Sequence, residues 1–307
     1  LQDVKGSRIW IADINNDNYP DLLWGGDVGM IKNHIRVMLN VENPDKNSPN
    51  KRIFVDFTEE SGIAKSRNSN NSNRITDVAS LADVNNDGNI DLVTSIYYHR
   101  LQMYDDDPGD RTEVLLNDGT GHFTMVPNNG LHDFAFVDTL PRGLINCTGI
   151  AFLDYDYDGN IDIYFSTWFI DYAANLAGLG EYKMKDFLFK GNGDGSFTNI
   201  SNSGIERVAE PMYGVNVTDW NNDGWQDILT SPYCRSGGSL FCNNKNGTFT
   251  DVARDVGYNA HTMQGDNGQN LCQWEANPGD YNNDGYMDLL QDFVHGGYDN
   301  YEGRTTI

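Results

Sequence analysis

Residues 81–93 read LADVNNDGNIDLV, and the pattern in this stretch decides the fold. Side chains that end in oxygen recur at every second position, and a glycine comes before the last of them. At this density the carboxylates of Asp83, Asp87 and Asp91 repel one another, and the apolar residues on either side do nothing to offset the repulsion. A bound cation is therefore expected among them.

The same pattern occurs five times along the 307 residues, with starting points 61 to 71 residues apart. Such self-similarity at a fixed spacing is typical of a chain built from repeated supersecondary units. We call the nine-residue acidic stretches loops 1 to 5 and count positions 1 to 9 within each. They cover residues 13–21, 83–91, 154–162, 219–227 and 280–288.

The surroundings of each loop predict β-strands. An alternating or continuous apolar run precedes and follows every loop, and both runs are rich in β-branched and aromatic residues. Further along, TEVLLNDGTGHFTMV (112–126), DFLFKGNGDGSFTNI (186–200) and SLFCNNKNGTFTDV (239–252) each place a turn between two short strands. The first copy has the longer NVENPDKNSPNKRIFVDF (40–57) there. Each copy thus predicts four antiparallel strands, although the last one ends where its third strand begins.

Repeated four-stranded units without helical patterns between them predict an all-β fold, a β-propeller whose radial repetition hides the sheet edges. A solenoid is the alternative, but its repeats run to only about 20 to 50 residues. We expect one propeller domain over residues 1–307, incomplete at both ends or closed in an unusual way. Its blades are predicted at 7–64, 74–130, 146–205, 211–258 and 271–307.

The loops have the chemistry of calcium sites, because calcium prefers oxygen ligands in a flexible loop with a glycine for the sharp turn. Positions 1, 3, 5 and 9 supply side-chain oxygen, and position 7 varies as if only its carbonyl were used. The predicted ligands are Asp13, Asn15, Asp17, Tyr19 and Asp21; Asp83, Asn85, Asp87, Asn89 and Asp91; Asp154, Asp156, Asp158, Asn160 and Asp162; Asp219, Asn221, Asp223, Trp225 and Asp227; and Asp280, Asn282, Asp284, Tyr286 and Asp288.

Differences among the loops predict differences in affinity. Position 6 is glycine except for Asn18, which tolerates positive φ better than most residues, so loop 1 should bind calcium more weakly. Loop 3 has four carboxylates where the others have three, and we expect it to bind most tightly. The loops differ from EF-hands, which need a glutamate at position 12 and flanking helices. Polar turns that bind no ion are the alternative.

The formal net charge of −24 argues against binding to nucleic acid or to an anionic membrane surface. No window approaches the ~20 apolar residues of a membrane span, and the chain does not open with a signal peptide. Cys234 and Cys242 flank a Gly-Gly turn and could form a disulfide, with free thiols as the alternative. Five glycosylation sequons favour secretion over a cytosolic location: Asn70, Asn146, Asn199, Asn216 and Asn246.

Three of the acidic stretches resemble the FG-GAP/VCBS repeats of integrin α-subunit propellers and of bacterial and eukaryotic surface proteins: DVNNDGNIDL (83–92), DYDYDGNIDI (154–163) and DWNNDGWQDI (219–228). With FLFKGNGDGSFTNISNSGI (187–205), residues 154–205 resemble the subgroup associated with ASPIC/UnbV domains. The resemblance covers nearly the whole chain. It implies seven blades, about five Ca²⁺ ions, an extracellular location, and a role in adhesion, matrix assembly or ligand capture. Only five copies are present, and Asn18 departs from the pattern.

A protein or glycan partner is expected on the face opposite the calcium loops, where long irregular connections gather. Candidate contact residues there are Tyr97, Tyr98, Arg100, Trp168, Tyr172, Tyr298 and Tyr301, with packing at the blade ends as the alternative.

Three functions compete. A noncatalytic module for adhesion or filament assembly is favoured, a lectin is the second hypothesis, and a calcium-dependent polysaccharide lyase is the third. The six histidines show no metal or triad spacing, so we expect no enzyme.

Overall fold

The computed structural model describes ten stretches of the chain: residues 8–25, 35–67, 78–96, 112–134, 145–168, 185–206, 212–232, 238–258, 272–294 and 304–306. These stretches form β-sheets and one helical turn. Within them, no helix is both long enough and apolar enough to cross a membrane.

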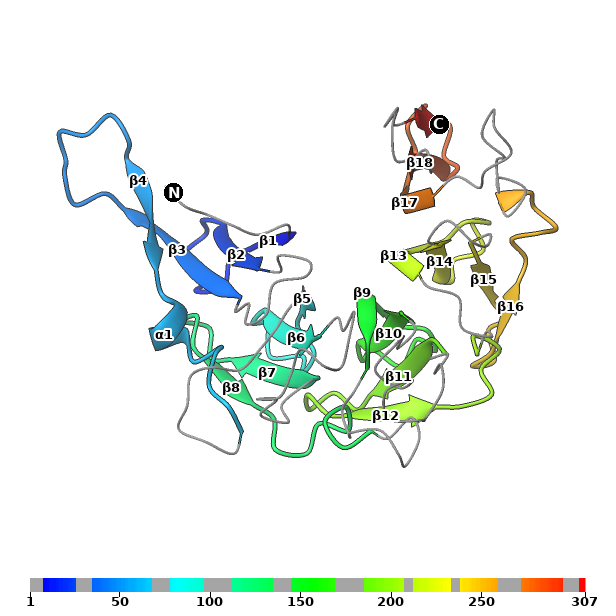
Figure 1. Cartoon of the computed structure of the whole chain (residues 1–307), viewed down its shortest axis with the longest axis horizontal. Coiled ribbons are helices and arrows are strands. Elements are labelled where there is room, and N and C mark those ends of the chain that lie inside the picture. The colour runs from blue at the N-terminus through cyan, green and yellow to red at the C-terminus, as the bar shows by residue number, and fades with distance from the viewer. Residues whose placement is uncertain are drawn as a thin grey trace, which may run out of the picture. The chain divides into compact units, whose positions relative to one another are not determined.

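The strands form five antiparallel sheets in which neighbours along the chain are neighbours in the sheet (Figure 1). We number the sheets 1 to 5. Sheet 1 contains β1 (Arg8–Ala12), β2 (Asp21–Gly25), β3 (Arg36–Glu42) and β4 (Arg52–Asp56), followed by the turn α1 (Thr58–Ser61). Sheet 2 contains β5 (Val78–Ala82), β6 (Asp91–Ser95), β7 (Glu113–Asn117) and β8 (Phe123–Met125).

The remaining sheets repeat this order, and sheet 5 has three described strands. Sheet 3 contains β9 (Cys147–Leu153), β10 (Asp162–Thr167), β11 (Phe187–Gly191) and β12 (Phe197–Ile200). Sheet 4 contains β13 (Met212–Thr218), β14 (Asp227–Pro232), β15 (Leu240–Asn243) and β16 (Phe249–Asp251). Sheet 5 contains β17 (Cys272–Gly279), β18 (Asp288–Val294) and β19 (Arg304–Thr306).

These strands confirm the all-β prediction and the strand positions within each predicted repeat. The long insertion in the first copy joins β3 to β4, which pair from Met38 with Asp56 to Glu42 with Arg52. The predicted third strand of the last copy is β19, and it pairs with β18. Every acidic loop connects the first strand of its sheet to the second. The pattern of residues alone was sufficient here because strand alternation and turn residues are local signals.

The second strand is buried on both faces in sheets 2 and 3, whereas the first strand of sheet 1 alternates between half-buried and exposed residues. All residues of β6 and β10 are buried, in agreement with their continuous apolar runs. In β1, Ile9 and Ile11 are 66% and 65% exposed. At the corresponding places in β5, Ala79 is buried and Leu81 packs against the same apolar cluster.

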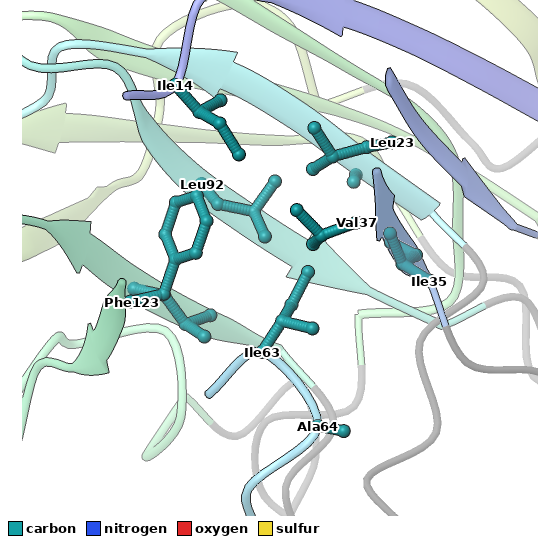
Figure 2. Close-up of a cluster of buried hydrophobic side chains, with 10 residues drawn as sticks. Ile14, Leu23, Ile35, Val37, Ile63, Ala64, Leu92 and Phe123 are labelled. Atoms are coloured by element: carbon teal, nitrogen blue, oxygen red, sulfur yellow. The ribbon is translucent and has the colours of Figure 1, made fainter. Parts of the chain in front are cut away.

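The apolar cores lie between consecutive sheets. Figure 2 shows the core between sheets 1 and 2, where Leu23 and Val37 of sheet 1 pack with Leu92 and Phe123 of sheet 2. Two further clusters join sheet 3 to sheet 4 and sheet 4 to sheet 5. Each pair of sheets therefore depends on its neighbour for stability, as in repeat proteins whose units bury a face only by stacking.

A glycine turn after the fourth strand helps to join sheets. The backbone N–H of Phe249 in sheet 4 donates to the carbonyl of Ser203, in the turn that follows sheet 3, at 2.6 Å. At the next residue, Gly204 (φ +91°), an added Cβ would lie 2.2 Å from the Phe249 carbonyl oxygen. Only glycine allows the two backbones to approach this closely.

Contacts divide the chain into two compact units. One comprises Leu1–Ile145 with Gly191–Thr198, and the other comprises Asn146–Lys190 with Asn199–Ile307. A single propeller domain over residues 1–307 remains a prediction.

Candidate metal centre

All five acidic loops share one backbone geometry, in which the position 1 carboxylate closes the turn. Its two oxygens accept the N–H groups of positions 5 and 6. In loop 2, Asp83 accepts from Asp87 at 3.0 Å and from Gly88 at 2.9 Å. The same pair of bonds occurs in loops 1, 3, 4 and 5 at 2.7 to 3.1 Å.

The position 9 carboxylate stands at the start of the second strand and is held from two directions. One oxygen of Asp91 accepts the N–H of Val84 at 3.0 Å, and the other accepts the N–H of Asn117 in β7 at 2.8 Å. Asp21 and Asp227 have equivalent bonds. Asp162 and Asp288 accept the position 2 N–H at 2.9 and 3.1 Å.

Position 9 is buried in the first four loops, where Asp21, Asp91, Asp162 and Asp227 have no exposed surface. Burial raises the pKa of Asp91 to about 6; the N–H bonds lower it, and Asp87 and Asp83 raise it further. For the same reasons the pKa of Asp227 is about 6. A cation among these oxygens would stabilise the charged form.

Two left-handed residues shape each loop. Position 4 has a φ of 56° to 60° in every loop although it is asparagine or tyrosine, and position 6 has a φ of 66° to 88°. Asn18 adopts the left-handed conformation with a φ of 66°, as its place in the repeat predicts. Since its N–H still donates to Asp13 at 2.7 Å, loop 1 keeps the common turn without the glycine.

Loop 3 has the most complete set of convergent oxygens. Carboxylate oxygens of Asp154, Asp156 and Asp162 lie within 4.8 Å of one another. The Oδ1 atom of Asp156 is buried and accepts no hydrogen bond. A buried oxygen without a hydrogen bond destabilises the folded protein. Three converging carboxylates that include such an atom therefore fit a hard metal ion, which prefers oxygen ligands.

A lysine from β11 also enters loop 3. Lys190 Nζ pairs with the Oδ2 atoms of Asp156 and Asp158, the latter at 2.8 Å. These contacts raise the pKa of Lys190, and the hydrogen bond from Lys190 lowers the pKa of Asp158. The ammonium group offsets part of the charge that a metal ion would otherwise neutralise.

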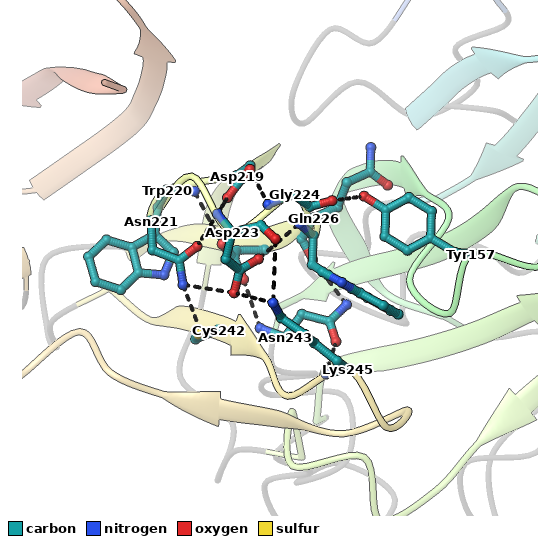
Figure 3. Close-up of polar contacts among 12 residues, drawn as sticks. Tyr157, Asp219, Trp220, Asn221, Asp223, Gly224, Gln226, Cys242, Asn243 and Lys245 are labelled. Atoms are coloured by element: carbon teal, nitrogen blue, oxygen red, sulfur yellow. Dashed lines mark hydrogen bonds and ion pairs between the residues drawn. The ribbon is translucent and has the colours of Figure 1, made fainter. Parts of the chain in front are cut away.

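Basic side chains enter two other loops. Arg52 of β4 pairs with Asp17 at 3.0 Å, and its guanidinium carbon lies 3.3 Å from the centre of the Tyr19 ring. Lys245 pairs with Asp223 at 3.3 Å (Figure 3). Sequence reasoning missed these three partners because they lie 22 to 35 residues from the loops. Strand pairing, which brings the third and fourth strands of a sheet and the turn between them beside the loop of that sheet, could have indicated them.

The sequence predicts that position 7 binds the metal ion through its backbone carbonyl. The structure shows a hydrogen bond from the backbone N–H group of the same residue. Its N–H donates to the position 5 carboxylate at 2.8 to 2.9 Å in all five loops. The side chains of Tyr19 and Tyr286 are largely exposed. The metal-ligand assignments of all 25 residues remain predictions.

The predicted contact, glycan and disulfide residues have mixed outcomes. Trp168 is 3% exposed and packs on Tyr213, with the ring centres 5.3 Å apart, so it is a packing residue and not a surface contact. The other six candidate contact residues, Tyr97, Tyr98, Arg100, Tyr172, Tyr298 and Tyr301, lie outside the described residues.

Of the sequons, Asn199 and Asn246 are exposed, Asn216 is half-buried, and Asn70 lies outside the described residues. Asn146 is fully buried, and a glycan there would require its exposure. Cys242 is a free thiol that accepts a hydrogen bond from Asn221 at 3.7 Å, while Cys234 lies outside the described residues. The disulfide and the glycosylation sites remain predictions.

Comparison with known proteins identifies the repeat. Residues 174–230 and 219–290 match the model of the FG-GAP-like repeat, and these matches include loops 4 and 5. The ASPIC/UnbV subgroup remains a prediction. No curated protein sequence matches the chain.

Two solved structures are similar at low identity. One is an Agrocybe aegerita lectin described for specific recognition of non-reducing terminal N-acetylglucosamine, with 16% identity over 97% of this chain and a TM-score of 0.45. The other is the Photorhabdus luminescens Tc holotoxin pore, with 14% identity over 98% of this chain and a TM-score of 0.33. This chain spans 65% of the lectin chain and 14% of the toxin chain.

Proposed function

This chain is an FG-GAP repeat protein, and from that premise we propose that it is a noncatalytic, calcium-binding β-propeller module of an extracellular protein. Its role is ligand binding, adhesion or assembly. FG-GAP-like repeats are generally noncatalytic, which agrees with the absence of a triad or metal-histidine motif from the sequence.

The observation that carries the proposal is the shared geometry of the five loops. In every loop the side chains at positions 1, 5 and 9 are locked by backbone N–H groups, which leaves further lone pairs on their oxygens for a cation. Calcium accepts six to eight oxygens in flexible geometry, whereas magnesium demands a tight octahedron and retains water. Loops of nine residues with four side-chain oxygens and one carbonyl suit calcium better.

The arrangement of the cores supports the propeller. Within each unit, apolar clusters lie between sheets 1 and 2, between sheets 3 and 4 and between sheets 4 and 5, as between the blades of a propeller. Ile9 and Ile11 of β1 are exposed, whereas the residues at the same places in β5 pack against the preceding sheet. In a closed ring, the exposed face of β1 would pack against another blade in the same way.

The extracellular location rests on calcium affinity and charge. Calcium modules that work outside cells bind with dissociation constants of about 0.1 to 1 mM, and cytosolic calcium would leave such sites empty. Partner binding on the face opposite the loops, and self-assembly into a filament, belong to the same proposal and rest on sequence alone.

Exposed aromatic rings on the loops favour a second candidate function, glycan binding. Tyr157, Tyr281 and Tyr286 are 50%, 47% and 64% exposed, and Tyr157 stacks edge-on against Trp225 with the ring centres 4.5 Å apart. Flat amphipathic rings beside polar oxygens can contact a sugar face. A glycan array probed with and without calcium tests this candidate, and an array without any specific signal would exclude it.

Calorimetric titration of the chelator-treated protein tests the main proposal. We expect about five calcium ions to bind in the 0.1 to 1 mM range, with magnesium at least tenfold weaker. Equal binding of both ions, or no heat on calcium addition together with unchanged melting, would contradict the proposal.

A further inference from the structure

A single asparagine links neighbouring loops in each of the two units. Asn117 ends β7 of sheet 2, and its Nδ2 atom donates to the carbonyl of Ile14, position 2 of loop 1, at 2.8 Å. Asn243 ends β15 of sheet 4, and its Nδ2 atom donates to the carbonyl of Tyr155, position 2 of loop 3, at 2.8 Å. Both asparagines are buried. The same bond thus recurs with the same partners in the repeat.

Each asparagine also holds a candidate ligand of its own sheet. The backbone N–H of Asn117 donates to Asp91 at 2.8 Å, and that of Asn243 donates to Asp227 at 2.7 Å. These carboxylates occupy position 9 of loops 2 and 4. One residue therefore contacts a ligand of its own loop through its backbone and the preceding loop through its side chain.

The chain of hydrogen bonds continues to a ligand of the preceding loop. The N–H of Ile14 donates to Asp21 at 3.1 Å, and the N–H of Tyr155 donates to Asp162 at 2.9 Å. Asp21 and Asp162 occupy position 9 of loops 1 and 3. Two buried carboxylates of neighbouring loops are thus connected by the backbone N–H and C=O of one residue and by one asparagine.

A second set of contacts runs in the opposite direction, from position 4 of one loop to the next loop. Asn16 donates to the side-chain oxygen of Asn89 at 2.9 Å, Asn222 donates to the carbonyl of Gly285 at 2.8 Å, and Tyr157 donates to the carbonyl of Gly224. Since their acceptors lie at positions 6 and 7, these bonds reach the part of the turn that precedes the position 9 ligand. Neighbouring loops are therefore connected at both ends.

We propose that Asn117 and Asn243 are positioning residues that couple cation binding between adjacent loops, so that an ion in loop 1 or 3 favours binding in loop 2 or 4, and the reverse. The inference rests on the proposed calcium binding. Its physical basis is that an ion fixes the position 9 carboxylate, this fixes the position 2 peptide, and the asparagine then holds the neighbouring position 9 carboxylate in its binding geometry. By linkage, the coupling must be reciprocal.

Asn40 offers a matched control within the chain. It ends β3 of sheet 1, its N–H donates to Asp21 at 2.7 Å, and its Nδ2 atom donates to the position 8 carbonyl of Pro20 at 3.1 Å. Asn117 and Asn243 make the same position 8 bond, to Ile90 and Gln226. Among the described residues, the side-chain amide of Asn40 donates to no second acidic loop.

Asparagine-to-aspartate substitution removes the Nδ2 donor, and with it both the bond to the preceding loop and the position 8 bond, and keeps an oxygen. Asn40→Asp removes the position 8 bond alone, so the difference between the variants isolates the link. The side-chain oxygen of Asn117 accepts the N–H groups of Gly119 and Gly121, and that of Asn243 accepts the N–H group of Lys245. Asn117→Asp and Asn243→Asp should therefore fold with the turn between the third and fourth strands intact. Asn117→Ala and Asn243→Ala remove the same donor without adding a charge.

The experiment is calcium titration of the whole chain by calorimetry, together with terbium luminescence sensitised by Trp225 for loops 3 and 4. In the wild type we expect a Hill coefficient above 1. Asn117→Asp or Asn243→Asp alone should lower it, because one pair of loops stays coupled, and the double variant should bring it to 1. Each substitution should weaken binding in its own pair of loops about 3- to 10-fold, the worth of one buried hydrogen bond. Asn40→Asp should shift affinity without changing the Hill coefficient.

The outcomes separate two failures. A wild type that binds neither calcium nor terbium would overturn the proposed function itself. A wild type that binds both ions with a Hill coefficient of 1, or equal effects of the substitutions at Asn40, Asn117 and Asn243, would overturn the coupling alone. If the alanine and aspartate variants have the same effect, the loss of the Nδ2 donor causes it and the added charge does not.

Discussion

Loops 2 and 3 have the same backbone but neutralise their carboxylates differently. In loop 2, position 3 is Asn85, whose amide donates to Asp87 at 3.0 Å. In loop 3, position 3 is Asp156, and Lys190 supplies the positive charge from β11. Among the described residues no basic side chain pairs with loop 2. The expectation that loop 3 binds most tightly counts only the carboxylates within the loop, and the structure adds a cation from a neighbouring strand that competes with the metal ion.

Removal of calcium is expected to have the largest effect on the stability of the protein. It tests whether loop 2, which has no basic partner among the described residues, and loop 3, which has Lys190, both need a metal ion. At 10 mM calcium and dissociation constants of 0.1 to 1 mM, each site adds about 1.4 to 2.7 kcal/mol. Excess chelator should lower the melting temperature by several degrees for each site that it empties, since ~1 kcal/mol shifts a domain of about 150 to 250 residues by about 2 to 4 °C. Scanning calorimetry measures the shift, and an unchanged melting temperature would mean that neither loop binds.

Loss of the position 5 carboxylate should abolish calcium binding in its own loop, and the size of the effect can be compared between loops 2 and 3. Asp158→Ala removes the acceptor for the N–H of Asn160 and one of the two partners of Lys190, so its effect should exceed that of Asp87→Ala. We expect about 1 to 3 kcal/mol less calcium-dependent stabilisation in each variant, by melting with and without calcium. A larger effect at Asp87 would show that the lysine replaces the ion in loop 3.

Removal of the lysine should act in opposite directions on the two states of loop 3. Lys190→Met retains the apolar stem and leaves Asp156 and Asp158 without their ammonium partner. The chelated protein should lose up to about 1 kcal/mol, a small value because Lys190 is partly exposed. Calcium affinity should rise about tenfold at one site by calorimetric titration, since the metal no longer displaces a charge.

A control for this variant is Lys46→Met. Lys46 pairs with Glu42 on the surface, and among the described residues it makes no ion pair with a carboxylate of the loops. It should change neither calcium affinity nor stability. Equal changes in affinity for both variants would mean that long-range charge, and not the position of Lys190, sets the affinity of loop 3.

The smallest effect concerns position 6. Asn18→Gly should stabilise the protein by less than about 1 kcal/mol, because the left-handed conformation is free for glycine and only tolerated by asparagine. Gly88→Asn should cost a similar amount, since nothing lies within 4 Å of an added Cβ there. Chemical denaturation with calcium present measures both, and a cost well above that value at Gly88 would indicate a role beyond backbone conformation.

The repeat, the strands and the loop positions could be read from the sequence because they depend on residues close together in the chain. Alternation between two faces defines a strand, and nine residues with oxygen at fixed spacing define the turn. The left-handed conformation of Asn18 belongs to the same class of local inference, since the other four copies have glycine at that position.

Only the tertiary structure decided what surrounds the loops. Lys190 reaches Asp156 across 34 residues, and Asn117 reaches Ile14 across 103, because strand pairing and sheet stacking bring them together. Sheet packing also buries Trp168, which the sequence placed among surface contacts. A pattern of spacings specifies the oxygens of a site, whereas their charge balance and their connection to the next site depend on which distant side chains the fold places against them.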